Sequence, residues 1–120
     1  MATLKEGELT FLKKYNELLN SMDEGFTFLS EVTDFEDATI STVFADLVHA
    51  FQQLNVSHEQ LISIIEWNDF SPFQKAVEAM STWFETAEEN KQELVTNHII
   101  PAFQAWRRPI QLKLNQYLQH

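Results

Sequence analysis

Apolar residues recur along the chain at the spacing of a helical face. The first run steps by three and four residues and consists of Leu12, Tyr15, Leu19, Met22, Phe26 and Leu29. Such steps keep side chains on one face, because an α-helix has about 3.6 residues per turn. The pattern predicts one long helix from about Glu8 to Val32. Gly25 lies inside it, where a glycine is either merely tolerated or permits a bend or the close approach of another helix.

A second helix follows after a short acidic connection. Thr33 or Asp34 is a suitable N-cap for a helix from about Glu36 to Leu54. Its apolar face consists of Val43, Phe44, Leu47, Val48, Phe51 and Leu54. Ser57 and Gln60 then match a capping box, the pattern in which a serine and a residue three positions later satisfy the first backbone donors of a helix. The second helix is therefore predicted to end before Ser57.

The third predicted helix runs from His58 to about Glu88. Its apolar face in the second half consists of Phe73, Val77, Met80, Phe84 and Ala87. The pair Ser71 and Pro72 interrupts it, because serine is a favoured N-cap and proline a favoured first helical residue. We expect this helix to be broken or kinked near Pro72.

The last predicted helix runs from about Lys91 to Leu118. Its apolar face consists of Ile99, Phe103, Trp106, Ile110, Leu114 and Tyr117. Pro101 and Pro109 each remove a backbone hydrogen-bond donor, so we expect a break or kink near Pro101 more than near Pro109. Extending the heptad spacing of the third helix places His98 on the inward side, as a half-buried histidine with a polar partner or as a pH-sensitive group.

These four helices define the expected architecture. The chain has only 2 Gly and 3 Pro in 120 residues, too few turn residues for a sheet protein. Short connections make sequential helices antiparallel. The sequence predicts an all-α, up-down-up-down four-helix bundle that forms a single domain over residues 1–120.

Composition narrows the possible chemistry. The chain has no cysteine, so disulfides, thiolate nucleophiles and cysteine zinc sites are excluded. A nucleophile elbow and a glycine-rich phosphate loop are also missing from the sequence. Asp46 and His49 are the nearest match to the Glu-x-x-His motif of di-iron bundles, and they occur once, with Asp in place of Glu. We expect no catalytic residue, no metal site, no cofactor and no enzymatic activity.

The charge is acidic and uneven. The net charge is −10, and the segment between Lys14 and Lys75 has eleven acidic and no basic residues. An acidic surface disfavours binding to nucleic acid and to anionic membranes. It serves either solubility alone or attraction of a basic partner. The chain shows no signal-peptide pattern and no apolar run of about 20 residues, so we expect a cytoplasmic protein outside the membrane.

Aromatic and arginine residues mark the candidate binding surface. They gather around the Ser71-Pro72 interruption and within the stretch HIIPAFQAWRRPI, and Trp and Arg are enriched at interface hot spots. The candidate partner-binding residues are Trp67, Phe70, Phe73, Trp106, Arg107 and Arg108. The alternatives are that the aromatics widen the core face and that the arginines pair with neighbouring acidic helices.

Three classes of function remain open. The first is a non-enzymatic protein-interaction module, an adaptor or chaperone-like bundle that binds a partner helix in an apolar groove or associates with itself as a homodimer. The second is an acidic inhibitor of the immunity type, or a nucleic-acid mimic, directed at a basic target. The third is a bundle enzyme or metalloprotein, for which the sequence contains no motif.

One resemblance bears on this choice. In size, acidity, helicity and lack of cysteine the chain resembles small export chaperones of flagellar and secretion systems, and also helical immunity or inhibitor proteins. The likeness is one of composition and assigns no site residue.

Overall fold

A computed structural model of the chain describes residues 4–118, which form helices and turns and contain no strand. In chain order the helical elements are α1 (Glu6–Glu31), α2 (Ala38–Ile64), α3 (Ser71–Ser81), η1 (Thr82–Glu85), η2 (Glu88–Asn90), α4 (Lys91–Leu94), η3 (Val95–Ile99) and α5 (Ile100–Leu118). Because α4, the π-helical turn η3 and α5 follow one another directly, the chain forms four main helical segments. The predicted all-α helical bundle is confirmed.

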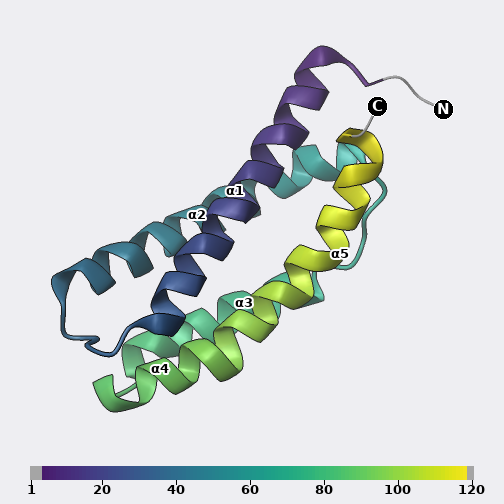
Figure 1. The fold of residues 1–120 in the computed structure, drawn as a ribbon. Coiled ribbons are helices and arrows are strands. Elements are labelled where there is room, and N and C mark those ends of the chain that lie inside the picture. Colours follow the sequence, from purple (N-terminus) through teal and green to yellow (C-terminus); the bar gives the residue numbers. More distant parts are fainter. Residues whose placement is uncertain (1–3, 119–120) are drawn as a thin grey trace.

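The helices alternate in direction along an elongated molecule of 51 × 24 × 20 Å (Figure 1). Close backbone contacts join α1 with α2, α1 with α5, and α3 with α5, whereas contacts between α2 and α3 are sparse. The order around the bundle is therefore α2, α1, α5, α3. The ring of helices is open between α2 and α3, which we call the edge helices.

The first helix follows its sequence pattern closely. All six residues of the predicted face are buried in α1. A Cβ atom added at Gly25 would lie 3.1 Å from Cδ2 of Leu47, on α2. Of the interpretations offered for this glycine, the close approach of another helix is therefore the one that the structure supports.

The predicted boundary between the second and third helices was wrong. α2 continues through Ser57 to Ile64. The Ser57 hydroxyl donates to the carbonyl of Gln53 at 2.6 Å, one turn back in the same helix, and caps no new helix. No glycine or proline stands near this position, and the buried face continues from Leu54 to Leu61, so nothing ends the helix there.

The next helix begins at Ser71, with Pro72 in its first turn. The Asp69 carboxylate accepts hydrogen bonds from the Ser71 backbone N–H at 3.1 Å and from the Ser71 hydroxyl at 2.6 Å. These two hydrogen bonds hold the pKa of Asp69 below its usual range. Residues 65–70, which lie between α2 and α3, are not helical, so Ser71 starts a separate helix.

The inward face of α3 also differs from the prediction. Its buried residues, with those of η1, are Phe73, Ala76, Met80 and Trp83. Val77 and Phe84, which were predicted to point inward, are 39% and 75% exposed. From Phe73, an apolar face can continue by steps of three, four and three residues or by steps of four, three and four, because both match the period of a helix. The buried residues of the structure follow the first series.

The last segment keeps its predicted face. Ile99, Phe103, Trp106, Ile110 and Leu114 are buried, and Tyr117 is half-buried. His98, by contrast, is exposed, so its predicted inward position was wrong. The heptad extension that placed it inward crossed η1 and η2, and these turns reset the helical phase.

None of the helices within residues 4–118 combines the length and the apolar character that crossing a membrane requires.

Candidate functional site

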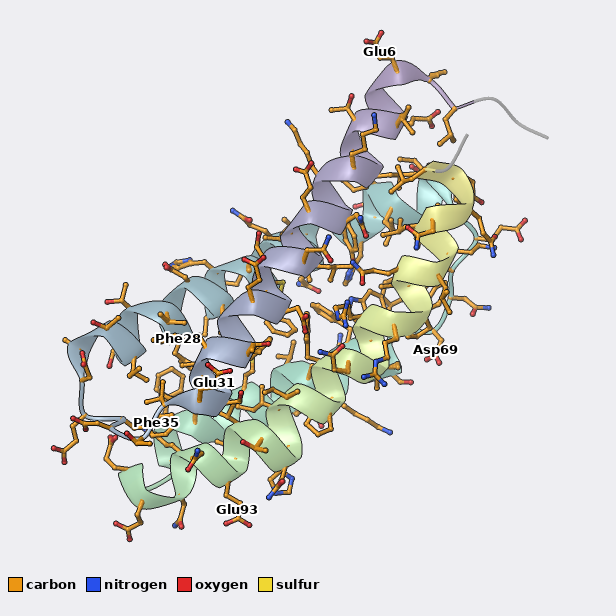
Figure 2. All side chains as sticks on the ribbon, in the orientation of Figure 1. Glu6, Phe28, Glu31, Phe35, Asp69 and Glu93 are labelled. Carbon is orange, nitrogen blue, oxygen red and sulfur yellow. The ribbon has the colours of Figure 1, made fainter. Side chains whose placement is uncertain are left out.

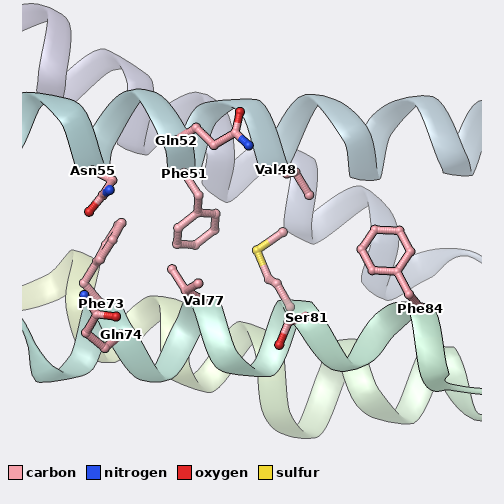
Figure 3. A pocket seen from close by; sticks show the side chains of 10 residues that line it. Val48, Phe51, Gln52, Asn55, Phe73, Gln74, Val77, Ser81 and Phe84 are labelled. Carbon is pink, nitrogen blue, oxygen red and sulfur yellow. The ribbon is translucent and has the colours of Figure 1, made fainter.

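An open groove lies between the two edge helices (Figure 3). It has a volume of about 350 Å³, and no charged side chain lines it. The lining residues are Val48, Phe51, Gln52 and Asn55 of α2, and Phe73, Gln74, Val77, Met80, Ser81 and Phe84 of α3 and η1. These ten residues define the α2–α3 groove. Figure 3 shows Phe51 of α2 and Val77 of α3 pointing toward each other across it.

Aromatic side chains connect the two walls. The rings of Phe51 and Phe73 lie 5.6 Å apart between centroids. Further along, Phe44 stacks on Trp83 at 4.2 Å and meets Phe84 edge-on at 5.7 Å. Phe84 nevertheless remains 75% exposed. Accessible apolar surface therefore lies along a channel whose base is closed by aromatic packing.

A second depression lies between α1 and α2 and has a volume of about 510 Å³. Its lining includes the oppositely charged Lys14 and Glu17 beside apolar Phe11 and Leu18. Exposed Val56 also lines this depression, so the difference lies in charge: the α2–α3 groove is the better candidate site because its lining residues are all uncharged.

Phe73 also belongs to an aromatic cluster on the inner side of the groove. We define the aromatic cluster as Tyr15, His58, Trp67, Phe70, Phe73 and Trp106. The His58 ring lies 4.7 Å from Phe70, 4.6 Å from Phe73 and 5.3 Å from Trp106, between centroids. Its Nε2 atom lies 3.0 Å from the hydroxyl of Tyr15. The cluster thus joins α1, α2, α3 and α5.

Burial sets the protonation of this pair. It lowers the pKa of His58 to about 4. Burial also raises the pKa of Tyr15, and the nearby Trp106 indole offsets part of that rise. The indole N–H of Trp106 has no acceptor at hydrogen-bond geometry within residues 4–118. Near pH 7 both partners are therefore neutral, and a hydrogen bond joins the Tyr15 hydroxyl to Nε2 of His58.

Comparison with known protein families gives a match over most of the chain. A family model described as a domain of unknown function, DUF8042, matches residues 10–108. The chain belongs to the DUF8042 family. The matched region contains the whole α2–α3 groove and the whole aromatic cluster of this DUF8042 chain. No curated protein and no solved structure matches the chain.

The four predicted aromatic residues of this DUF8042 chain come together in one place. Phe73 and Trp106 are buried, at 1% and 0% exposure, whereas Trp67 and Phe70 are half-buried. Phe70 stacks on Trp106 at 5.5 Å, and Trp67 meets it edge-on at 6.1 Å. The cluster widens the core, which was the alternative interpretation of these residues. Phe73 alone among the four also lines the groove, and their role in partner binding stays a prediction.

The two predicted arginines have different surroundings. Arg107 is half-buried, and its Nε atom lies 3.7 Å from Oδ1 of Asp23 on α1. It also donates at 2.7 Å to the side-chain oxygens of Gln104 and Gln111. The predicted pairing with an acidic helix is thus confirmed for Arg107. Arg108 is exposed, and within residues 4–118 it forms no ion pair.

Sequence reasoning missed the two residues that organise this site. His58 was taken as the first residue of a helix, whereas it lies in the interior of α2 and reaches the core. Phe84 was taken as a core residue, whereas it is the most exposed apolar residue of the groove. The inward position of His58 could have been predicted from one continuous helix, because Leu54, His58 and Leu61 then share one face. Within residues 4–118 no three His, Asp or Glu side chains gather as a possible metal site.

Proposed function

We propose that this DUF8042 protein is a non-enzymatic protein-interaction module that holds an amphipathic helix of a partner protein in the α2–α3 groove. One observation carries the proposal: Val77 and Phe84 expose 39% and 75% of their surface in an uncharged channel between two edge helices. A helix placed in the channel would pack against both walls and close the open ring as a fifth helix.

The dimensions of the groove favour a helix as the occupant. Its lining residues recur at helical spacing on both walls, from Val48 to Asn55 and from Phe73 to Phe84. The longer wall extends about 16 Å at about 1.5 Å per residue, which corresponds to about three helical turns. A partner with apolar residues at steps of three and four fits such a channel by inserting its ridge between the walls.

The distribution of carboxylates favours this proposal over an acidic inhibitor. Figure 2 shows Glu31 and Asp69, both from the acidic stretch, on well-separated parts of the molecule. Asp23, from the same stretch, pairs with Arg107 of α5, and both side chains are partly exposed. Glu31, Asp69 and Asp23 therefore do not share one face, as the acidic stretch of an inhibitor would require. The proposed location is the cytoplasm, since a cysteine-free chain fits a reducing compartment.

The first test uses a helix-forming peptide of about 18 residues, with leucines at steps of three and four and glutamines elsewhere. This neutral peptide carries an apolar stripe and no charged side chain. We expect it to bind the protein, and we expect Phe84→Glu to weaken binding at least about tenfold because a charge would be buried against the peptide. Fluorescence anisotropy measures the affinity, and amide chemical shifts of the protein locate the contact.

The matched control is Leu112→Glu. Leu112 is 69% exposed, like Phe84, but it lies on α5 outside the groove. This variant should bind the neutral peptide with the affinity of the unmodified protein. Equal weakening in both variants, or shifts that avoid α2 and α3, would refute the proposed function.

A further inference from the structure

The rim of the α2–α3 groove is acidic on both sides. Three glutamates each follow a groove-lining polar residue by four positions. The pairs are Asn55 and Glu59, Gln74 and Glu78, and Ser81 and Glu85. Residues four apart lie one above the other on an α-helix surface, which places Glu59 and Glu78 on the groove sides of α2 and α3. Glu85 ends the 3₁₀ turn η1 and directly follows the groove residue Phe84. Each of the three glutamates is exposed to solvent.

These carboxylates are not neutralised by the bundle. The ion pairs within residues 4–118 are Lys91 with Glu88 and Arg107 with Asp23. Lys75 of α3 lies three residues before Glu78, and it forms no ion pair within residues 4–118. An apolar channel is thus flanked by Glu59 on the α2 side and by Glu78 and Glu85 on the opposite side.

We infer that the partner helix is basic, with Lys or Arg side chains on both sides of its apolar stripe. This inference rests on the proposed function. Such a helix would place cations beside the carboxylates of both walls while its apolar side chains fill the channel. The carboxylates are exposed, so they contribute mainly to association rate and to the choice of partner, and salt weakens their effect.

Charge also argues against a second copy of this chain as the occupant. Each copy carries a net charge of −10. Pairing two grooves face to face would bring the acidic rims of both copies together, and like charges that meet across an interface are unfavourable. A second copy would add to the repulsion among the rim carboxylates, whereas a basic helix would reduce it.

The test compares three peptides that share one apolar stripe. Their remaining positions are all Lys, all Gln or all Glu. At about 20 mM salt we expect the Lys peptide to bind at least about tenfold tighter than the Gln peptide, and the Glu peptide to bind weakest. Near about 0.5 M salt the three affinities should converge, because the Debye length then falls to about 4 Å.

Two double variants distinguish the effect of the rim carboxylates from the effect of the protein's net charge. Glu78→Gln with Glu85→Gln removes two rim carboxylates, whereas Glu24→Gln with Glu31→Gln removes two exposed carboxylates of α1. We expect the rim variant to lose most of the preference for the Lys peptide, by at least about fivefold, and the α1 variant to change it by less than about twofold. Binding of the Gln peptide should be unaffected in both.

The outcomes distinguish the inference from the function on which it rests. Equal affinity for the Lys and Gln peptides, or equal loss in both double variants, overturns the basic partner and leaves the groove as a binding site. Failure of the Gln peptide to bind overturns both. A concentration-dependent dimer in sedimentation, abolished by Phe84→Glu, would assign the groove to a second copy and also overturn the inference.

Discussion

At the scale of single residues, the Tyr15–His58 hydrogen bond couples the core to pH. The pKa of His58 is about 4 in the folded protein, because burial disfavours the charged ring. In the unfolded chain it returns to about 6.5. Between these two values the unfolded state binds more protons, so the free energy of unfolding rises with pH through this window. Stability is therefore lost as pH falls below about 6.5 and levels off near pH 4.

We expect His58→Gln to flatten this dependence, because glutamine keeps a polar partner for Tyr15 and does not titrate. Between pH 7 and pH 5 the unmodified protein should lose about 1 kcal/mol more stability than the variant, a value reduced for the partly exposed ring. Urea unfolding at several pH values measures the difference. His49→Gln, at an exposed position of the same helix, is the control. Identical pH profiles for His58→Gln and the unmodified protein would contradict the assignment.

The residue scale also shows where sequence reasoning reaches its limit. The buried face of α1 could be predicted, because six apolar residues follow one helical phase without interruption. His58 had been placed at a helix start by the capping-box pattern, yet α2 continues through it. His98 had been placed inward by a phase carried across η1 and η2, and a phase read from spacing holds only inside one continuous helix.

At the scale of elements, the contact between α1 and α2 depends on Gly25. A Cβ atom at this position would lie only 3.1 Å from the Leu47 side chain, so a larger residue requires Leu47 to move. We expect Gly25→Val to lower the free energy of unfolding by about 1–3 kcal/mol, because valine has one dominant helical rotamer and overpacks the interface. Thermal or urea unfolding measures this change.

Gly7→Val is the matched control for that substitution. Gly7 also lies in α1, but nothing lies within 4 Å of a Cβ atom placed there. Its effect should stay within about 0.5 kcal/mol, as for other surface substitutions. A similar loss in both variants would contradict this assignment, because valine has a higher helix propensity than glycine and only the contact with α2 predicts a loss specific to Gly25.

The groove itself could not be predicted from the pattern of apolar residues. The spacing placed Val77 and Phe84 in the core, yet a helical face that includes Phe73 can equally continue through Ala76 and Trp83. Trp83 is fixed by stacking on Phe44 of α2, a contact between residues distant in sequence. The choice between the two faces therefore depends on tertiary packing, which spacing within one helix does not contain.

At the scale of the whole molecule, the open ring predicts uneven local stability. α1 and α5 each pack against two helices, whereas the close backbone contacts of α3 are mainly with α5 and those of α2 mainly with α1. α3 has only 11 residues and follows a non-helical segment. Helices shorter than about 12–15 residues depend on packing for their stability, so α3 should open more readily than α1.

Amide hydrogen exchange tests this expectation. We expect amides in the middle of α3 to exchange at least about tenfold faster than those in the middle of α1 and α5, which corresponds to about 1.4 kcal/mol of local opening. Adding the neutral peptide should slow exchange along the groove walls in α2 and α3. The middle of α1 serves as the internal control, since its protection should not change. Uniform protection in the free protein, or slowing that spreads equally to α1, would show that the bundle opens as one unit and that the edge helices are not its weak side.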